Sequence, residues 1–274
     1  MNGLEDILDK MKEKYDIKPV TPDDMQKNRV NWYNESTGNL NEFDGYNCEA
    51  CRNKGYIALI TPEGFEAHKE CRCQVIRATL RRAQRSGLGD ILSKCTFDKY
   101  EDSEDWQKLI KGKAKAFCED DEAKWFYIGG QVGCGKTHLC TAICGHYIKA
   151  GKEVKYMLWC EESKTLKALV NDTSYTEQIS DYKNVDVLYI DDFLKVQSGE
   201  NPTPADIKLA FEIINHRLLD DSKITIISSE KMLEEVMEYD EATMSRIFQQ
   251  AGNYKINIGR DRNRNYRLRG GVNV

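Results

Sequence analysis

The sequence has no run of about eighteen apolar residues, so it predicts no transmembrane helix. Residues 1–19 also lack the apolar segment of a secretory signal, because charged residues interrupt them throughout. The net charge of −5 argues against a protein that coats nucleic acid over its whole surface. We therefore expect a cytoplasmic protein with no membrane partner.

The composition is that of a globular protein, with 40% hydrophobic and 31% charged residues. A chain of 274 residues has room for one large domain or two small ones. The charge is uneven, since residues 255–274 hold six basic side chains and one acidic one. This local excess of positive charge could bind phosphates, although such a run is also typical of a solvated face.

The N-terminal region, residues 1–44, is expected to be a helical arm. Its first apolar residues recur at the three- and four-residue spacing of an amphipathic helix, at Leu4, Ile7, Leu8, Met11 and Tyr15. Pro19 and Pro22 are expected to end this helix, and residues 23–44 are polar. A short helix cannot bury its apolar face alone, so it either packs on its own chain or docks on a partner.

Four of the ten cysteines form a cluster within residues 45–95, at Cys48, Cys51, Cys71 and Cys73. Two closely spaced pairs on either side of a hairpin-sized insert suit a tetrahedral Zn²⁺ site, whereas redox-active or plainly buried thiols are the alternatives. A closed shell of four thiolates leaves no open position, so the metal would fold the module and would not catalyse. An arginine-rich helix is expected from about Cys73 to Ser86.

Residues 96–274 alternate between strand-like and helix-like segments, which predicts an α/β fold with a parallel sheet covered by helices on both faces. The expected strands are 125–128, 154–159, 185–190, 224–227 and 254–258. The expected helices are 137–150, 161–170, 204–219, 231–239 and 241–250.

A phosphate-binding loop is the strongest functional signal. Residues 130–137 read GQVGCGKT and match G-x-x-x-x-G-K-T, with an apolar strand before them and a helix after them. Glycines let the backbone N–H groups surround phosphates, and the following helix presents its positive N-terminus to the anion. We expect Lys136 to lie near the β- and γ-phosphates of ATP and the Thr137 hydroxyl to ligate Mg²⁺. The expected nucleotide-binding residues are Gly130, Gly133, Cys134, Gly135, Lys136, Thr137 and His138.

An apolar strand then delivers two carboxylates, Asp191 and Asp192, to the edge of the sheet where ligands bind. We expect Asp191 to serve the Mg²⁺ side of the site and Asp192 to polarise the attacking water. In ATPases of this kind, glutamate is the commoner residue at the second of these two positions. Because aspartate is one methylene shorter, we expect slow intrinsic hydrolysis.

Two further positions are candidates for contacts with the γ-phosphate. The strand at 224–227 ends in Ser228 and Ser229, either of which could touch the phosphate or the water. Arg246 lies in an otherwise apolar helical stretch and could reach the nucleotide of a neighbouring subunit, or could be an ordinary surface arginine.

Taken together, the motifs resemble the replicative helicase loaders of the DnaC/DnaI type, over roughly residues 45–274. The matching segments, in the family's order, are NCEACRNKGYI, CRC, SGL, TFDKY, GGQVGCGKTHL, VLYIDDF, ITIISSE, MSRIF and NYRLR. The resemblance implies an AAA+ ATPase core in residues 96–274, with three layers, sheet order 5-1-4-3-2 and little or no helical lid. It also implies that the protein loads a hexameric helicase onto single-stranded DNA.

The same resemblance assigns roles to individual residues. Lys136, Thr137, Asp191 and Asp192 would bind nucleotide and Mg²⁺, and Ser229 would be the sensor. Arg246 would be an arginine finger acting between self-associated subunits, and Arg267 the last phosphate-sensing arginine. The zinc module at 45–95 would contact the helicase, and Lys164 and Lys167 lie where the family contacts DNA.

Other classes of protein fit the sequence less well. A transposition helper ATPase of the IstB type shares the core but usually lacks the zinc module, and it is the main alternative. A RadA-type recombination ATPase needs a much longer chain. In a zinc-bearing thymidine kinase the cysteines follow the phosphate loop, whereas here they precede it. A non-enzymatic zinc adaptor would not need Lys136, Asp191 and Arg246 together.

Overall fold

The computed structural model describes Met11, residues 21–196 and residues 200–268. The chain divides into two compact units, residues 1–78 and 79–274, and the division falls within one helix. Apart from Met11, the helix expected over Leu4–Tyr15 lies outside the described residues, as does Arg269. The domain boundaries expected after residues 44 and 95 stay predictions.

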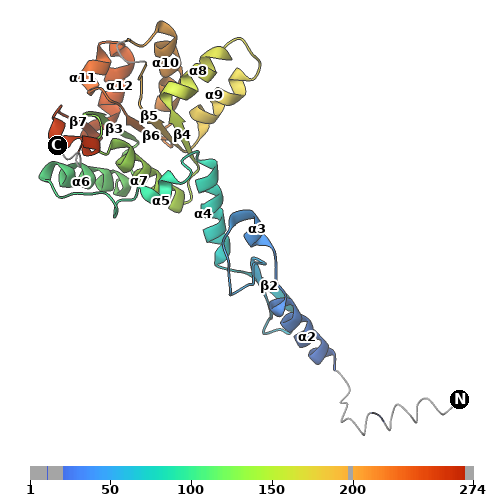
Figure 1. Cartoon of the computed structure of the whole chain (residues 1–274). Coiled ribbons are helices and arrows are strands. Elements are labelled where there is room, and N and C mark those ends of the chain that lie inside the picture. Colours follow the sequence, from blue (N-terminus) through green and yellow to red (C-terminus); the bar gives the residue numbers. More distant parts are fainter. Residues whose placement is uncertain (1–10, 12–20, 197–199, 269–274) are drawn as a thin grey trace. The chain divides into compact units, whose positions relative to one another are not determined.

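The first unit contains a helix that the sequence analysis did not identify. Helix α2 (Pro22–Glu35) begins where we expected a proline to end an earlier helix (Figure 1). Pro22 takes the first helical position, where its missing N–H costs nothing. The side chains of Thr21 and Asp24 each accept a hydrogen bond from the other residue's backbone N–H, which forms a capping box.

Around α2, the first unit consists of a short helix, a hairpin and the start of a longer helix. These elements are α3 (Leu40–Asp44), the antiparallel strands β1 (Tyr56–Ile60) and β2 (Glu66–Glu70), and α4 (Cys73–Arg85). The Asn34 side chain of α2 exchanges two 2.9 Å hydrogen bonds with the backbone of Ala58 in β1. Helix α2 therefore covers part of the hairpin's backbone edge.

The second unit has the fold that the sequence predicts. Its five strands are β3 (Trp125–Gly130), β4 (Val154–Leu158), β5 (Val187–Asp191), β6 (Ile224–Ser228) and β7 (Lys255–Ile258). All neighbouring strands run parallel, in the order β7-β3-β6-β5-β4. Numbered along the domain, this order is 5-1-4-3-2, so the predicted AAA+ arrangement is confirmed.

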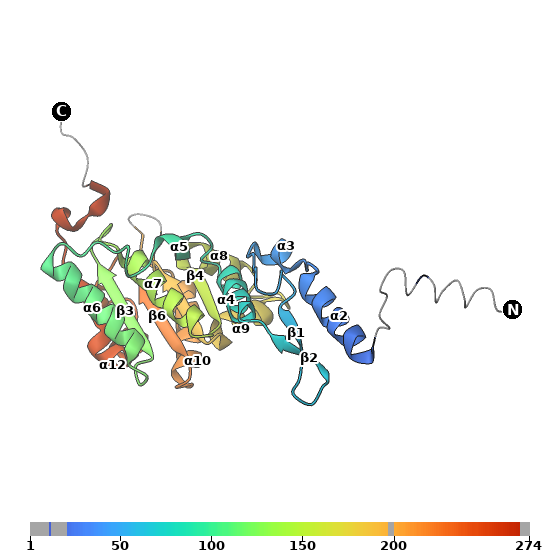
Figure 2. The same ribbon diagram turned by 90° about the horizontal axis from the view of Figure 1, so that it is seen from below.

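Helices cover both faces of this sheet. Side chains alternate between the faces along each strand, so apolar strands present hydrophobic side chains on both faces. In β3, Phe126 and Ile128 pack into one core while Trp125 and Tyr127 pack into the other. Figures 1 and 2 show α6 (Asp105–Glu119) and α7 (Lys136–Lys149) on the first side. The second side carries α8 (Trp159–Ala168), α9 (Tyr175–Asn184), α10 (Pro204–Leu218), α11 (Leu233–Met237) and α12 (Glu241–Ala251).

The element boundaries differ from the expected ones in a few places. Trp159 begins α8 instead of ending β4, and it is fully buried against Phe193. Helices α6 and α9, and the short α5 (Ile91–Lys94), were not identified from the sequence. After β7, the described residues up to Leu268 form only two 3₁₀ turns, Arg262–Arg264 and Tyr266–Leu268. No helix of the described residues is both long and apolar enough to cross a bilayer.

Candidate nucleotide site and cysteine cluster

The phosphate loop connects β3 to α7 and has a backbone that only glycine adopts easily. Gly130, Gly133 and Gly135 have φ angles of 104°, 73° and 90°, in the region that disfavours L side chains. A Cβ on Gly135 would also lie 2.8 Å from a ring carbon of Tyr100. Gly135 caps the N-terminus of α7, so the helix dipole points at the space inside the loop.

The structure brings the expected phosphate and Mg²⁺ residues together. The Lys136 ammonium is buried and donates hydrogen bonds to the carbonyl oxygens of Gly130 (2.9 Å) and Gln131 (2.7 Å). The Thr137 hydroxyl lies 3.3 and 3.4 Å from the two carboxylate oxygens of Asp191. A hydroxyl beside a carboxylate offers the oxygen ligands that Mg²⁺ prefers, so these residues fit the metal.

Asp191 ends β5 and is only 5% exposed. Besides Thr137, its carboxylate accepts hydrogen bonds from the Ser228 hydroxyl, the Tyr156 hydroxyl (3.2 Å) and the backbone N–H of Asp192 (3.1 Å). These donors satisfy a charge that would otherwise be costly to bury. They also hold the carboxylate in one orientation, facing the phosphate loop.

Asp192 is held by a lysine that the sequence analysis did not single out. The Lys195 ammonium donates to the carboxylates of Asp192 (2.9 Å) and Glu230 (2.8 Å), and so bridges the ends of β5 and β6. Burial lowers the pKa of Lys195, but its hydrogen bonds to Glu230 and Asp192 outweigh this, so its pKa lies above the ordinary value. The ammonium therefore stays charged. Asp192 itself has a left-handed backbone, with φ of 53°.

A cavity of about 420 Å³ opens over these groups. Its lining includes five expected residues of the loop and the helix after it, Gly133, Gly135, Lys136, Thr137 and His138, and also the expected Asp192 and Arg267. The cavity is also lined by residues that were not expected, namely Lys195, Glu230, Lys99, Tyr100, Glu101 and Tyr266. A cavity of this size, with lysines and carboxylates at one end, suits a nucleoside triphosphate with its metal.

Other expected site residues lie in different surroundings. Cys134 is buried with its thiol donating to the Gln131 carbonyl oxygen, and burial raises its pKa. The Ser229 hydroxyl is also buried and donates to the carbonyl oxygen of Phe193 (3.1 Å), whereas Ser228 contacts Asp191. Arg246 is exposed on α12, where it donates to the Asn215 side chain (2.7 Å). Cys134, Ser229 and Arg246 are all absent from the cavity lining.

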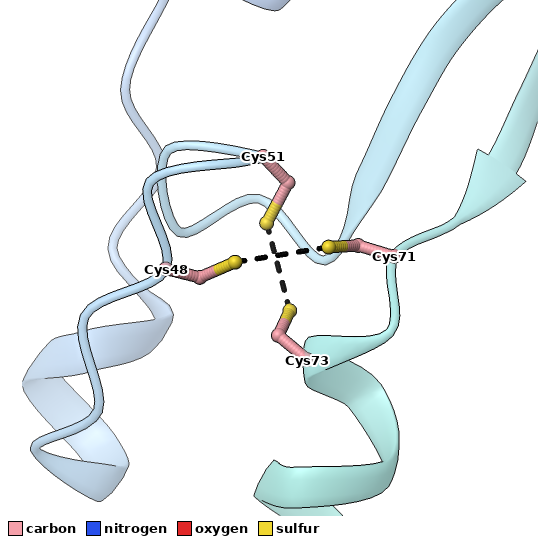
Figure 3. A group of neighbouring side chains, drawn as sticks. All are labelled: Cys48, Cys51, Cys71 and Cys73. Carbon is pink, nitrogen blue, oxygen red and sulfur yellow. Dashed lines mark hydrogen bonds between the residues drawn. The ribbon is translucent and has the colours of Figure 1, made fainter.

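The four clustered cysteines converge in the first unit, as Figure 3 shows. All are buried, and their sulfur atoms lie within 4.8 Å of one another. The Sγ atoms of Cys48 and Cys71 are 3.7 Å apart, and those of Cys51 and Cys73 are 3.5 Å apart. A tetrahedral Zn²⁺ with Zn–S bonds of about 2.3 Å requires sulfur separations of about 3.8 Å. The cluster therefore fits a Zn²⁺ ion, with a ligand from each of four positions.

A family comparison decides the affiliation of the second unit. Residues 95–252, more than half of the chain, match the model of the bacterial DnaA ATPase domain. The chain belongs to this family. It therefore carries an ATPase domain of the AAA+ type, and its fold is a nucleotide-binding fold.

Individual relatives support the resemblance seen in the motifs. The uncharacterized protein YqaM of Bacillus subtilis is 31% identical over 216 residues, which span 73% of this chain and 66% of YqaM. The replicative helicase loader DnaC of Escherichia coli strain K12 is 29% identical over 116 residues, 41% of this chain. The match spans about half of that loader's length, namely 47%.

Among solved structures, the crystal structure of DnaI has 20% sequence identity and a TM-score of 0.51. The match covers 62% of this chain and 92% of the DnaI chain. At this sequence identity it supports the fold alone. The DnaC/DnaI-type resemblance of the ATPase unit is confirmed, and the cysteine cluster in the first unit supports a small zinc module beside it.

Proposed function

We propose that this protein is an ATP-dependent loader that binds a hexameric replicative helicase and places it on single-stranded DNA during replication initiation. The sequence match to the DnaC loader carries the proposal, because it spans 41% of a chain whose residues 95–252 belong to a bacterial replication ATPase family. The site contributes the chemistry, since its lysines and carboxylates converge on one cavity.

The nucleotide roles follow from the contacts around the cavity. Lys136 would exchange its carbonyl partners for phosphate oxygens, while the backbone of the loop and the N-terminus of α7 hold the remaining phosphate charge. Thr137 and Asp191 would hold Mg²⁺, which neutralises phosphate charge when bound. Arg267 lines the same cavity and would contact phosphate at its open side.

Slow intrinsic hydrolysis has a structural rationale. Asp192 is the candidate for polarising the attacking water, and one of its oxygens is occupied by the Lys195 ammonium. A carboxylate that bonds an ammonium is a weaker acceptor for a water proton, so Lys195 should restrain hydrolysis until a partner rearranges the loop. Ser229 stays the proposed sensor by resemblance, although the contact of Ser228 with Asp191 favours Ser228 for a role beside the metal.

Self-association would complete the site. Arg246 lies outside its own cavity and is exposed, as a residue that acts on a neighbouring subunit must be. Its guanidinium donates a hydrogen bond to the neutral side chain of Asn215, so no carboxylate would have to be displaced from that contact. In the proposed assembly, the guanidinium would stabilise the charge of the phosphates during transfer.

The first unit would contact the helicase. Zinc held by the four cysteines would fix this unit's fold, and the hairpin and α2 would then present a defined surface. Single-stranded DNA would bind the ATPase unit, and Lys164 on α8 is exposed and free to contribute a phosphate contact. Lys167 instead pairs with Asp206 at 2.5 Å, so Lys164 is the better candidate of the two.

Complex formation with candidate hexameric helicases tests the proposal. The full-length protein is mixed with each helicase with and without ATP, and the complex is measured by size-exclusion chromatography with light scattering. We expect one helicase to form a complex and to be loaded on circular single-stranded DNA in an ATP-dependent manner. Lys136→Ala should abolish ATP binding, whereas Lys149→Ala, an exposed lysine at the other end of α7, should not.

Arg246→Ala separates the assembly role from nucleotide binding. The variant should bind ATP as the wild type does and lose helicase-stimulated hydrolysis on the order of a thousandfold. Lys108→Ala removes an exposed positive charge from α6, on the other side of the sheet, and should retain stimulation. A protein that binds ATP but forms no complex with any hexameric helicase, or an unchanged stimulated rate in Arg246→Ala, would contradict the respective part of the proposal.

A further inference from the structure

Tyr156 is the one residue of β4 that reaches the Mg²⁺ side of the nucleotide site by a hydrogen bond within the described residues. Its hydroxyl donates to Oδ2 of Asp191 at 3.2 Å. The other donors to this carboxylate come from the phosphate loop's helix, from β6 and from the chain after β5. If the Thr137 hydroxyl ligated a metal instead of bonding to Asp191, Tyr156 would be the one described residue that still donates a hydrogen bond to Oδ2 of Asp191.

The backbone of the same tyrosine is joined to the end of α4. Its N–H donates to the carbonyl oxygen of Ser86 at 2.7 Å, immediately after that helix ends at Arg85. Strand β4 lies at the edge of the sheet, so this bond satisfies a donor that no neighbouring strand could reach. Gly87, with φ of 81°, makes the turn there and approaches the Tyr156 Cβ.

Further contacts fix the end of α4 on this strand. The guanidinium groups of Arg82 and Arg85 each lie 3.7 Å from the same carboxylate oxygen of Glu153, just before β4. Ser86 is fully buried, and its hydroxyl donates to the carbonyl oxygen of Ala83 (2.7 Å). The last turn of α4 is therefore attached to β4 by its backbone and by two ion pairs.

The ring of Tyr156 is held by a contact that does not involve its hydroxyl. The ring itself packs against Tyr189, with centroids 5.3 Å apart, and this contact would survive the loss of the hydroxyl.

We propose that Tyr156 is a positioning residue that ties the orientation of the Asp191 carboxylate to the C-terminal end of α4. A shift of Ser86 and Gly87 moves the Tyr156 backbone, and the rigid ring transmits this movement to the hydroxyl on Asp191. The residue thereby couples the last turn of α4 to metal-dependent nucleotide binding. This inference rests on the proposed function, because it assigns a regulator to the same ATP and Mg²⁺ site.

Mg²⁺ titration of nucleotide binding tests the positioning role. A fluorescent ATP analogue is bound to the full-length protein first in EDTA and then at rising Mg²⁺ concentrations. Tyr156→Phe should bind the analogue in EDTA as the wild type does, but should need about tenfold more Mg²⁺ for half-saturation of the metal effect. Tyr182→Phe is the matched control, because its hydroxyl bonds Glu162 at 2.8 Å and not Asp191. It should titrate as the wild type does.

A double-mutant cycle tests the connection to α4. Gly87→Ala strains the left-handed turn beside Tyr156 and should raise the Mg²⁺ requirement about threefold to fivefold in the wild-type background. In the Tyr156→Phe background it should have no further effect, because the hydroxyl that transmits the shift is gone. An additive effect of Gly87→Ala would overturn the connection to α4.

The outcomes separate this inference from the proposed function. If Tyr156→Phe and Tyr182→Phe have the same Mg²⁺ requirement as the wild type, Tyr156 does not position Asp191, although the protein still binds ATP. If the wild-type protein itself shows no Mg²⁺-dependent nucleotide binding, the proposed ATP site fails, and the inference fails with it.

Discussion

The two units of this protein bury very different interiors. In the first unit, the hydrophobic cluster consists of the four cysteines, with Tyr46 and Ile57 packed partly against it. The ATPase unit has two extended clusters of aliphatic and aromatic side chains, one on each face of its sheet. A cluster of four thiols supplies little hydrophobic stabilisation, whereas the two larger cores can support a fold by burial alone. The first unit should therefore depend on a metal ion and the second should not.

Metal removal should cause the largest difference in stability between the two units. Binding of zinc by four cysteine thiolates contributes about 10–16 kcal/mol to the folding of small zinc modules. A chelator added without nucleotide should abolish hydrogen-exchange protection in β1 and β2 and leave β3 and β6 protected. Exchange measured by mass spectrometry resolves the two units in one experiment.

Substitutions of two cysteines, one inside the cluster and one outside it, provide the matched variants for this experiment. Cys71→Ser removes one proposed ligand and should mimic the chelator. Cys95→Ser changes a half-buried thiol outside the cluster and should leave the first unit protected. Full protection of β1 and β2 in the chelated protein would mean that the first unit folds without the metal.

A core truncation in the ATPase unit should have the opposite distribution and a smaller size. Phe117 on α6 is fully buried and packs against Phe126, with ring centroids 5.3 Å apart. Phe117→Ala should lower the free energy of unfolding of this unit by about 3–5 kcal/mol and leave the first unit unchanged. Leu109 on the same helix is 62% exposed, so Leu109→Ala should change it little. A loss of protection in both units would show that they unfold together.

The smallest expected effect concerns the contact of α2 with the hairpin. Asn34→Ala leaves the backbone N–H and C=O of buried Ala58 without the hydrogen bonds from that side chain, at a cost of about 1–3 kcal/mol. Asn28→Ala changes an exposed position on the same helix and should be nearly neutral. Hydrogen exchange in β1 and β2, measured by mass spectrometry, compares the two variants. Equal stability of the two would mean that α2 does not support the hairpin.

The sequence predicted the ATPase unit well because its signals are local and repeated. Apolar strands alternate with helices, and the phosphate loop and the acidic pair each follow a strand directly. The parallel sheet then brings Thr137 and Asp191 together, although 54 positions separate them. Strand order came from the family resemblance, because periodicity alone does not say which strands are neighbours.

The missed features depend on signals that were weak or absent. Helix α2 has no buried residue among its fourteen, so hydrophobic spacing could not reveal it. The capping box of Thr21 and Asp24, with Pro22 between them at the first helical position, was the readable signal. Tyr156 could not be found, since its role arises from a contact across the sheet with Asp191, 35 positions away. Lys195 likewise has a role only because β5 and β6 end side by side.

The most direct test is a crystal structure of the full-length protein grown with Mg²⁺ and a non-hydrolysable ATP analogue. We expect the phosphates inside the loop at residues 130–137, with the Lys136 ammonium on the phosphate oxygens and the metal between Thr137 and Asp191. A nucleotide bound elsewhere on the chain, or a loop that stays closed on Lys136 at saturating analogue, would contradict the assignment of this site.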